Sequence, residues 1–244
     1  MESDWPNWDG SNDGSNTFLS NPGGGLGPPS VACITSTKAL IVYPTGVNDT
    51  GVVDAIIVER DDVSLIENST VTIRSSSTNP YVDVQRMSDT RAVVALNDFT
   101  NSRIRVILLD VSGSTAVVLD DQAPSVTAAP SVSQLPSIKK VNDTRAVLDT
   151  YAEVFVVDIG TDTISFGARR AKPSQATSAL TVMSEQFIVY NGADRLTFAE
   201  IVGTDITPRA GWIFDPEGNI GLADINTARL SDTEIILFIE ANRS

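Results

Sequence analysis

The stretch from Ser88 to Asp120 reads SDTRAVVALNDFTNSRIRVILLDVSGSTAVVLD and decides the fold. It holds three short runs rich in β-branched and aliphatic residues, separated by a polar segment and a Ser-Gly turn. Runs of this kind between turn residues are typical of β-strands. The opening phrase returns as NDTRAV at Asn142–Val147, followed by another apolar run and a turn at Gly160. The sequence therefore predicts a repeated unit of antiparallel strands.

Weaker copies of the phrase give the repeat a regular period. The phrase is marked by a threonine, or by a glutamine in one copy, and successive markers are 53, 54, 42 and 47 residues apart: Thr37, Thr90, Thr144, Gln186 and Thr233. Units of about 40–50 residues with four strands each are typical of β-propeller blades. We expect an all-β, β-propeller-like domain over residues 31–244, with about five four-stranded antiparallel blades, the last of them incomplete.

The turns of the repeat have a local physical reason. A Ser or Asp side chain ahead of the marker threonine can hydrogen-bond the backbone two residues on, which tightens the link between the first two strands. Glycine at 113, 160 and 203 is expected to provide positive φ in the turns between third and fourth strands. No stretch has helical periodicity, and the nearest candidate, residues 222–230, contains poor helix formers.

Residues 1–30 differ from the rest of the chain. They are rich in Gly, Asn, Ser and Asp, which cannot bury enough apolar surface to fold alone. We predict an extended N-terminal arm that docks on a partner through Trp5, Trp8 and Phe18, because aromatic side chains dominate interface anchors. The alternative is that these aromatic residues fold back on the chain's own surface.

The repeated phrase, the strand run that ends in Asp and the glycine turn resemble the blade repeats of propeller-like proteins found among the structural proteins of tailed bacteriophages. The resemblance covers about Val31–Asn242. The arm is similar to the anchoring peptides that virion proteins thread over their neighbours. The resemblance implies a virion protein that is made in the host cytoplasm.

Composition excludes several classes of partner. The formal net charge of -14 repels phosphate backbones, so we expect no nucleic-acid binding. Arg86, Arg91, Arg103 and Arg105 could form a basic patch, although solvated strand faces explain them as well. The single cysteine, Cys33, lies in an apolar run and is expected to be buried. We expect neither an export signal nor membrane insertion, because no sufficiently long apolar run is present.

The sequence offers little catalytic chemistry. The absence of histidine removes the commonest general base and most zinc sites. The acidic pairs Asp61–Asp62 and Asp120–Asp121 are interpreted as solvated turns, because neighbouring strand residues point to opposite sides. A calcium loop at Asp9–Gly14 lacks the glutamate expected at its twelfth position. We predict no catalytic residue, no metal site and no cofactor.

These observations lead to a non-enzymatic structural or interaction protein, a component of a viral particle that docks through its arm and displays a propeller. The alternative is a glycan-binding lectin or host-receptor-binding module that contacts host-surface glycan. Tyr43, Tyr151 and Tyr190 fall near the ends of second strands, but Leu96 breaks this pattern in the second blade. A carboxylate hydrolase is the third and weakest hypothesis.

The end of the repeat predicts a partner. The last apolar run, Glu234–Ile239, is expected to be the second strand of the fifth blade. Its edge would expose free N–H and C=O groups, which soluble proteins rarely leave open. We therefore predict that another chain covers this edge and that the protein works in an oligomer or a larger assembly.

Overall fold

The computed structural model describes residues 29–45, 51–61, 64–75, 81–98, 103–126, 136–150, 152–172, 180–192, 195–213, 221–229, 231 and 234–242. The predicted partner-binding residues Trp5, Trp8 and Phe18 lie outside these ranges, as does the segment Asp9–Gly14. All regular elements in the described ranges are β-strands. No helix that could cross a membrane occurs in them.

The described strands form five antiparallel sheets, which we call blades. The first blade contains β1 (Ser30–Cys33), β2 (Lys38–Thr45), β3 (Val52–Arg60) and β4 (Leu65–Glu67), and β5 (Val71–Ser75) also pairs with β3. The second contains β6 (Val82–Arg86), β7 (Arg91–Asp98), β8 (Arg103–Asp110) and β9 (Val117–Gln122). The third contains β10 (Ser137–Asn142), β11 (Arg145–Asp149), β12 (Glu153–Ile159) and β13 (Ile164–Phe166), and β14 (Arg170–Ala171) pairs with β12. The fourth contains β15 (Leu180–Val182), β16 (Phe187–Gly192), β17 (Arg195–Val202) and β18 (Asp205–Ile213). In the fifth, β19 (Gly221–Arg229) pairs with β20 (Ile235–Asn242).

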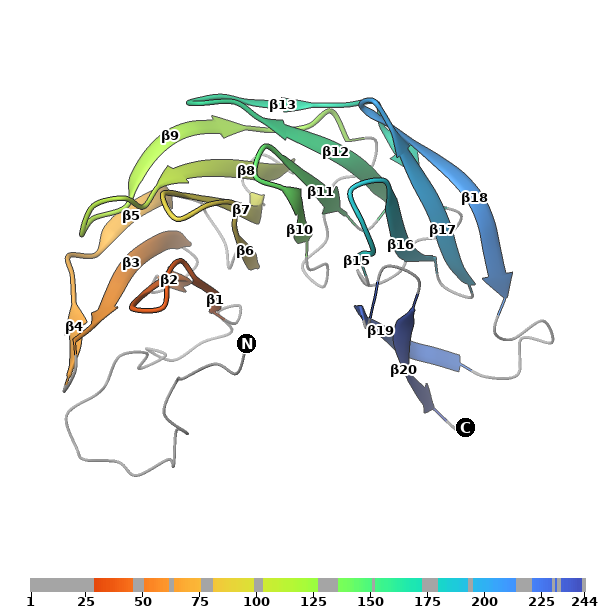
Figure 1. Cartoon of the computed structure of the whole chain (residues 1–244), viewed down its shortest axis with the longest axis horizontal. Coiled ribbons are helices and arrows are strands. Elements are labelled where there is room, and N and C mark those ends of the chain that lie inside the picture. Colours follow the sequence, from red (N-terminus) through yellow and green to blue (C-terminus); the bar gives the residue numbers. More distant parts are fainter. Residues whose placement is uncertain are drawn as a thin grey trace.

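The predicted fold class is confirmed: the protein is all-β and propeller-like, with four four-stranded paths and a two-stranded fifth blade among the described residues. Figure 1 shows the blades side by side along an arc, with β1, β6, β10 and β15 on its inner side and β9, β13 and β18 on its outer side. The partner predicted to cover the edge of β20 stays a prediction.

The core consists of layers between neighbouring blades. One apolar cluster joins the first blade to the second, another joins the second to the third, and a third joins the third to the fourth. In the first of these clusters, Leu40, Ile57, Val94 and Ile107 are fully buried. The first four blades therefore bury apolar faces against their neighbours.

The central strands of the second blade are buried on both faces. Val94 and Leu96 of β7 belong to the cluster with the first blade, whereas Val93 and Ala95 belong to the cluster with the third. Because successive side chains of a strand point to opposite faces, a strand between two neighbours needs a continuous apolar run. The inner strand β6 alternates instead, with buried Val residues between half-buried polar ones.

The turn phrase makes the same hydrogen bond in four blades. A side chain two residues before the marker accepts the marker's backbone N–H, whereas the sequence predicted this role for the Asp or Ser that directly precedes the marker. The four bonds are Thr37 N to Thr35 Oγ1 at 3.3 Å, Thr90 N to Ser88 Oγ at 3.3 Å, Thr144 N to Asn142 Oδ1 at 3.0 Å and Gln186 N to Ser184 Oγ at 3.3 Å.

Two local predictions are wrong. Among the described glycines only Gly203 has a positive φ, of 63°. It lies in the tight two-residue turn between β17 and β18, whereas the longer connections at Gly113 and Gly160 do not require that conformation. The sequence around Ile206 predicts a short last strand of the fourth blade, whereas this strand, β18, extends over nine residues.

Candidate functional site

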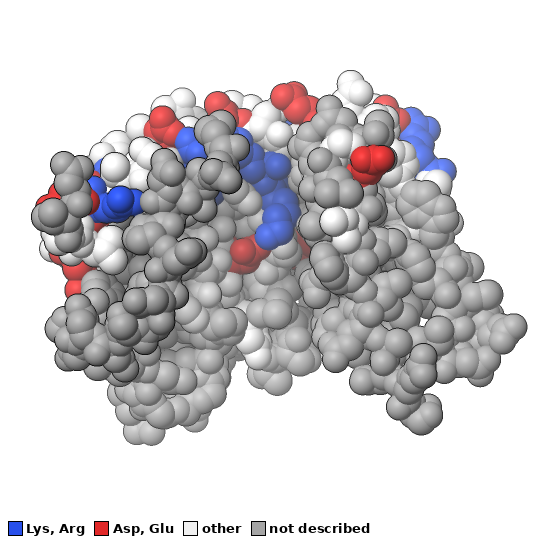
Figure 2. Space-filling view, turned by 60° about the horizontal axis from the view of Figure 1, so that its bottom comes forward, with Lys and Arg blue, Asp and Glu red and all other residues white. Residues whose placement is uncertain are grey.

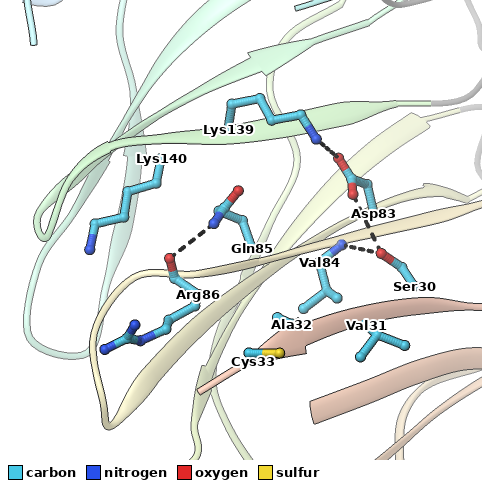
Figure 3. Close-up of a pocket in the computed structure, with 10 residues that line it drawn as sticks. All are labelled: Ser30, Val31, Ala32, Cys33, Asp83, Val84, Gln85, Arg86, Lys139 and Lys140. Carbon is cyan, nitrogen blue, oxygen red and sulfur yellow. Dashed lines mark hydrogen bonds and ion pairs between the residues drawn. The ribbon is translucent and has the colours of Figure 1, made fainter. Parts of the chain in front are cut away.

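A polar groove lies on the inner side of the arc, where the first three blades meet. Its cavity volume is about 460 Å³, within the range of small-molecule sites. The lining residues come from the inner strands β1, β6 and β10. Figure 3 shows the Lys139 side chain reaching Asp83 at one end of the pocket, while the Arg86 and Lys140 side chains extend toward the other end. We call it the inner groove and define it by its polar lining residues: Ser30, Cys33, Asp83, Gln85, Arg86, Lys139 and Lys140.

Asp83 ties the three blades together at one end of the inner groove. Its Oδ2 accepts the backbone N–H of Ile138 at 2.9 Å, the Ser137 hydroxyl at 3.2 Å and the Lys139 ammonium at 3.3 Å. Its Oδ1 accepts the Ser30 hydroxyl at 3.4 Å (Figure 3). Four donors from the first and third blades thus meet at one carboxylate of the second. Asp83 therefore positions its neighbours.

The same kind of link occurs one blade earlier. Ser30 lies seven residues before Thr37, and Asp83 lies seven residues before Thr90. Ser30 Oγ accepts the backbone N–H of Val84 in the next inner strand at 3.0 Å, as Asp83 does for Ile138. One repeat position thus joins β1 to β6 and β6 to β10, and this inner-strand link holds the wall of the groove.

Replacing Asp83 by asparagine should lower the free energy of unfolding by about 2 kcal/mol. Asparagine has nearly the same size as aspartate, but an NH₂ group replaces one of the two carboxylate oxygens. The donors that contact Asp83 therefore lose one acceptor atom. Chemical denaturation followed by circular dichroism measures the change. Asp89→Asn is the matched control, because that carboxylate is mostly exposed and pairs only across a turn with Arg86. Equal stabilities of the two variants would contradict the role assigned to Asp83.

Three cations border the inner groove, and each has a carboxylate neighbour. Arg86 Nη2 pairs with Asp89, Lys140 Nζ pairs with Asp143 at 2.5 Å, and Lys139 pairs with Asp83. Asp89 and Asp143 are 70% and 75% exposed, so these two pairs are surface pairs. Hydrogen bonding to Lys140 and the charge of that lysine lower the pKa of Asp143. Surface pairs contribute little energy, so Arg86 and Lys140 can exchange them for a ligand at small cost.

The charge of the inner groove contrasts with that of the whole chain. The protein carries a formal net charge of -14. Figure 2 shows a band of Lys and Arg atoms that descends into the hollow of the arc, with Asp and Glu atoms along the rim and at the lower end of the band. The cations of the groove attract small anions that can reach them, whereas the acidic protein around the groove repels large polyanions. The arrangement is therefore suited to a small anionic ligand.

Cys33 corrects a prediction: it is exposed and lines the inner groove. Ala32 and Ile34 point into the apolar cluster between the first two blades. Because side chains alternate along a strand, Cys33 and Val31 must point away from that cluster. As the only cysteine of the sequence, Cys33 is a natural chemical probe of the groove.

Other predicted candidates lie elsewhere. Asp120–Asp121 is not a solvated turn but part of β9, where Asp121 pairs with Arg74 at 2.9 Å and with Arg105 at 2.6 Å. The arginines do not form one patch: Arg91 pairs with Asp162 in the next blade, at 3.2 Å. In the part of the chain that the structure describes, no three His, Cys, Asp or Glu side chains are grouped closely enough to hold a metal ion.

Comparisons with solved structures support the fold. A protein from Lactobacillus plantarum matches with a TM-score of 0.56 and 14% identity, covering 87% of this chain and 63% of its own. A "putative 6-phosphogluconolactonase" from Bacteroides fragilis matches with a TM-score of 0.50 and 13% identity, covering 82% and 60%. A protein of the same description from Bacteroides uniformis has a TM-score of 0.43 and 10% identity, covering 90% and 85%. The chain thus spans less than two thirds of the length of the first two neighbours.

These neighbours overturn the functional prediction. The sequence predicts a non-enzymatic component of a viral particle, or alternatively a glycan-binding or host-receptor-binding module, but the neighbours with a TM-score of 0.50 or more are bacterial proteins, and one of them is described as a putative enzyme. The expectation that the protein is not an enzyme is therefore wrong, because a protein of similar fold is described as a putative enzyme. No family model matches the chain, and no curated protein matches it. The chain is similar in fold to the Lactobacillus plantarum protein and to the Bacteroides fragilis protein described as a putative 6-phosphogluconolactonase.

Proposed function

We propose that the protein is a propeller enzyme whose inner groove binds a small phosphorylated sugar derivative and hydrolyses its lactone ring. The observation that carries the proposal is the presence of three cations, Arg86, Lys139 and Lys140, in the lining of one cavity of about 460 Å³. The description of the Bacteroides fragilis neighbour names a phosphorylated lactone, and both features of such a molecule suit the groove. Its phosphate needs cations, and its ring fits the volume.

The side chains of the groove support a division of roles. Arg86 and Lys140, whose carboxylate partners are exposed, are placed to bind the phosphate. Lys139, held by Asp83, is fixed in position and can stabilise negative charge on the lactone carbonyl oxygen. Water adds to the carbonyl carbon, the ring C–O bond breaks, and the ring oxygen takes a proton to give the open acid. Asp83 is a positioning residue in this scheme.

Removing the groove cations should reduce turnover of the phosphorylated substrate. Arg86→Gln and Lys140→Gln are each expected to lower kcat/KM for 6-phosphogluconolactone by about 10–100-fold, the loss of one charge-assisted hydrogen bond. Release of acid measures the rate, corrected for spontaneous hydrolysis. The unphosphorylated lactone should be affected less, because it lacks the group that these two cations bind. Arg103→Gln is the matched control, since that exposed arginine of β8 does not line the groove.

Ligand occupancy can be measured independently of turnover at Cys33. The open acid 6-phosphogluconate should slow alkylation of Cys33 by iodoacetamide, whereas gluconate at the same concentration should slow it much less. The Arg86→Gln variant should lose the protection. Protection without hydrolysis would leave an anion-binding groove and refute the lactonase activity. If neither protection nor hydrolysis is found, the proposal fails as a whole.

A further inference from the structure

A second cavity lies between the third and fourth blades, away from the inner groove. Its volume is about 490 Å³. β14 of the third blade forms one side, and β16, β17 and β18 of the fourth blade form the other. Its polar groups are Arg170, Tyr190, Thr197 and Arg209, and small apolar residues complete the wall. Neither the proposed lactonase reaction nor the inter-blade packing uses these polar groups together.

Tyr190 forms the floor of the cavity. Its side chain is only 1% exposed, and its hydroxyl lies beside the Arg170 guanidinium and the Thr197 side chain. Burial raises the pKa of Tyr190 above its ordinary value, and the nearby charges of Arg170 and Asp149 act in opposite directions. The phenol therefore stays protonated at neutral pH. It can donate a hydrogen bond to a ligand that enters the cavity.

The positive charge in the cavity comes from Arg170. Arg209 is paired with Glu200 across neighbouring strands, with Nε to Oε2 at 2.7 Å. Behind Tyr190, Asp149 is paired with Lys172 at 3.0 Å. Arg170 itself makes no ion pair with a carboxylate in the described ranges, and its residue is exposed at the mouth. One uncompensated guanidinium selects a ligand with a single negative charge.

We propose that this cavity binds a small monocarboxylate that has an apolar body. The planar guanidinium of Arg170 matches a carboxylate in a two-bond arrangement, and the Tyr190 hydroxyl adds a donor to the same anion. Ala171, Pro208 and Ala210 offer the apolar wall against which the body of the ligand packs. Thr197 provides a further hydroxyl next to Tyr190. The proposal is independent of the lactonase function.

Calorimetric titration of the full chain with sodium acetate, benzoate and 3-phenylpropionate tests the proposal. Benzoate and 3-phenylpropionate should bind saturably and more tightly than acetate, and the uncharged benzamide should bind at least tenfold more weakly than benzoate. Arg170→Gln should weaken benzoate binding by about 10–100-fold, and Tyr190→Phe by about tenfold. Arg170→Lys keeps the charge but loses the planar fork, so its affinity should fall between wild type and Arg170→Gln.

Arg86→Gln is the matched control, because it removes an arginine from the inner groove and should leave benzoate binding unchanged. Far-UV circular dichroism confirms that each variant is folded before titration. Three results would overturn the proposal: no saturable binding of any of the three carboxylates, equal binding of benzamide and benzoate, or unchanged affinity in a folded Arg170→Gln variant. Loss of binding in Arg86→Gln alone would place the carboxylate in the inner groove and would also refute it.

Discussion

Replacing Lys172 by methionine is expected to lower the free energy of unfolding by about 3–5 kcal/mol at pH 8, the cost of breaking a buried ion pair. Lys172 and Asp149 have side chains with no exposed surface, and the ammonium lies 3.0 Å from Asp149 Oδ1. It also donates to the Thr150 carbonyl at 3.3 Å. Methionine has a similar volume but leaves the carboxylate charged in an apolar setting. Chemical denaturation followed by circular dichroism measures the loss.

The pH dependence of the loss distinguishes a charge effect from poor packing. Burial raises the pKa of Asp149 to about 6, against the lowering effect of the Lys172 charge and hydrogen bond. A carboxyl whose pKa is higher in the folded state favours folding at low pH, and this contribution disappears as pH rises from about 4 to 6. Without Lys172 the pKa of Asp149 rises further. The Lys172→Met variant should therefore recover much of its lost stability below pH 5.

The double variant Asp149→Leu/Lys172→Met is the matched control. It removes both charges and should be within about 1 kcal/mol of wild type, because apolar replacement of a buried pair is often neutral. A single variant that is no less stable than wild type would contradict this account. So would a double variant as unstable as the single one, since the fault would then lie in packing.

The architecture could be predicted because two independent signals agree. The turn phrase around Thr90 and Thr144 returns at a blade-like spacing, and its local hydrogen bond forms in four blades. The apolar runs between the phrases match the central strands, which neighbouring blades bury on both faces. Strand ends were harder to predict. The extent of β18 depends on pairing with β17 along its whole length, which composition does not reveal.

The sequence analysis did not identify the inner groove, although three of its lining residues occupy the same position of the repeat. Counting four residues back from Thr37, Thr90 and Thr144 gives Cys33, Arg86 and Lys140, and the structure places all three along the groove. Grouping Arg86 with arginines close in sequence hid this relation, because those arginines lie on other strands. Repeat position, rather than proximity in the chain, decides which side chains share the inner surface of a propeller.

The buried ion pair of the third blade could not be predicted for a different reason. Lys172 and Asp149 are 23 positions apart and meet only because the chain after β13 returns as β14 to pair with β12. The sequence around Arg170 has no strand signature, since β14 is only two residues long. Contacts that depend on such a short strand are determined by tertiary packing and cannot be recognised from the sequence pattern.

Replacing Gly167 by alanine should destabilise the protein by about 3 kcal/mol, the upper range for overfilling a packed contact. Gly167 follows β13 in the third blade and donates its N–H to the Val156 carbonyl at 2.9 Å, which fixes its position. A Cβ atom there would lie 2.9 Å from both the carbonyl carbon and the Cβ of Thr204, and closer still to the Thr204 carbonyl oxygen. Thr204 belongs to the β17–β18 turn of the fourth blade, so the methyl group would push two blades apart.

Gly113→Ala is the matched control for Gly167→Ala, because a Cβ at Gly113 would approach no atom closer than 3.9 Å. Its stability should equal that of wild type or exceed it slightly, since alanine reduces the freedom of the unfolded chain.

Hydrogen exchange adds a second measurement. In Gly167→Ala, the amides of β17 and β18 should exchange faster, while those of β6 and β7 should not change. This pattern follows because the strain acts at one blade junction and the other junctions have their own apolar layers. Uniformly faster exchange in all blades would show that the arc unfolds as one unit, and would contradict a strain confined to this junction.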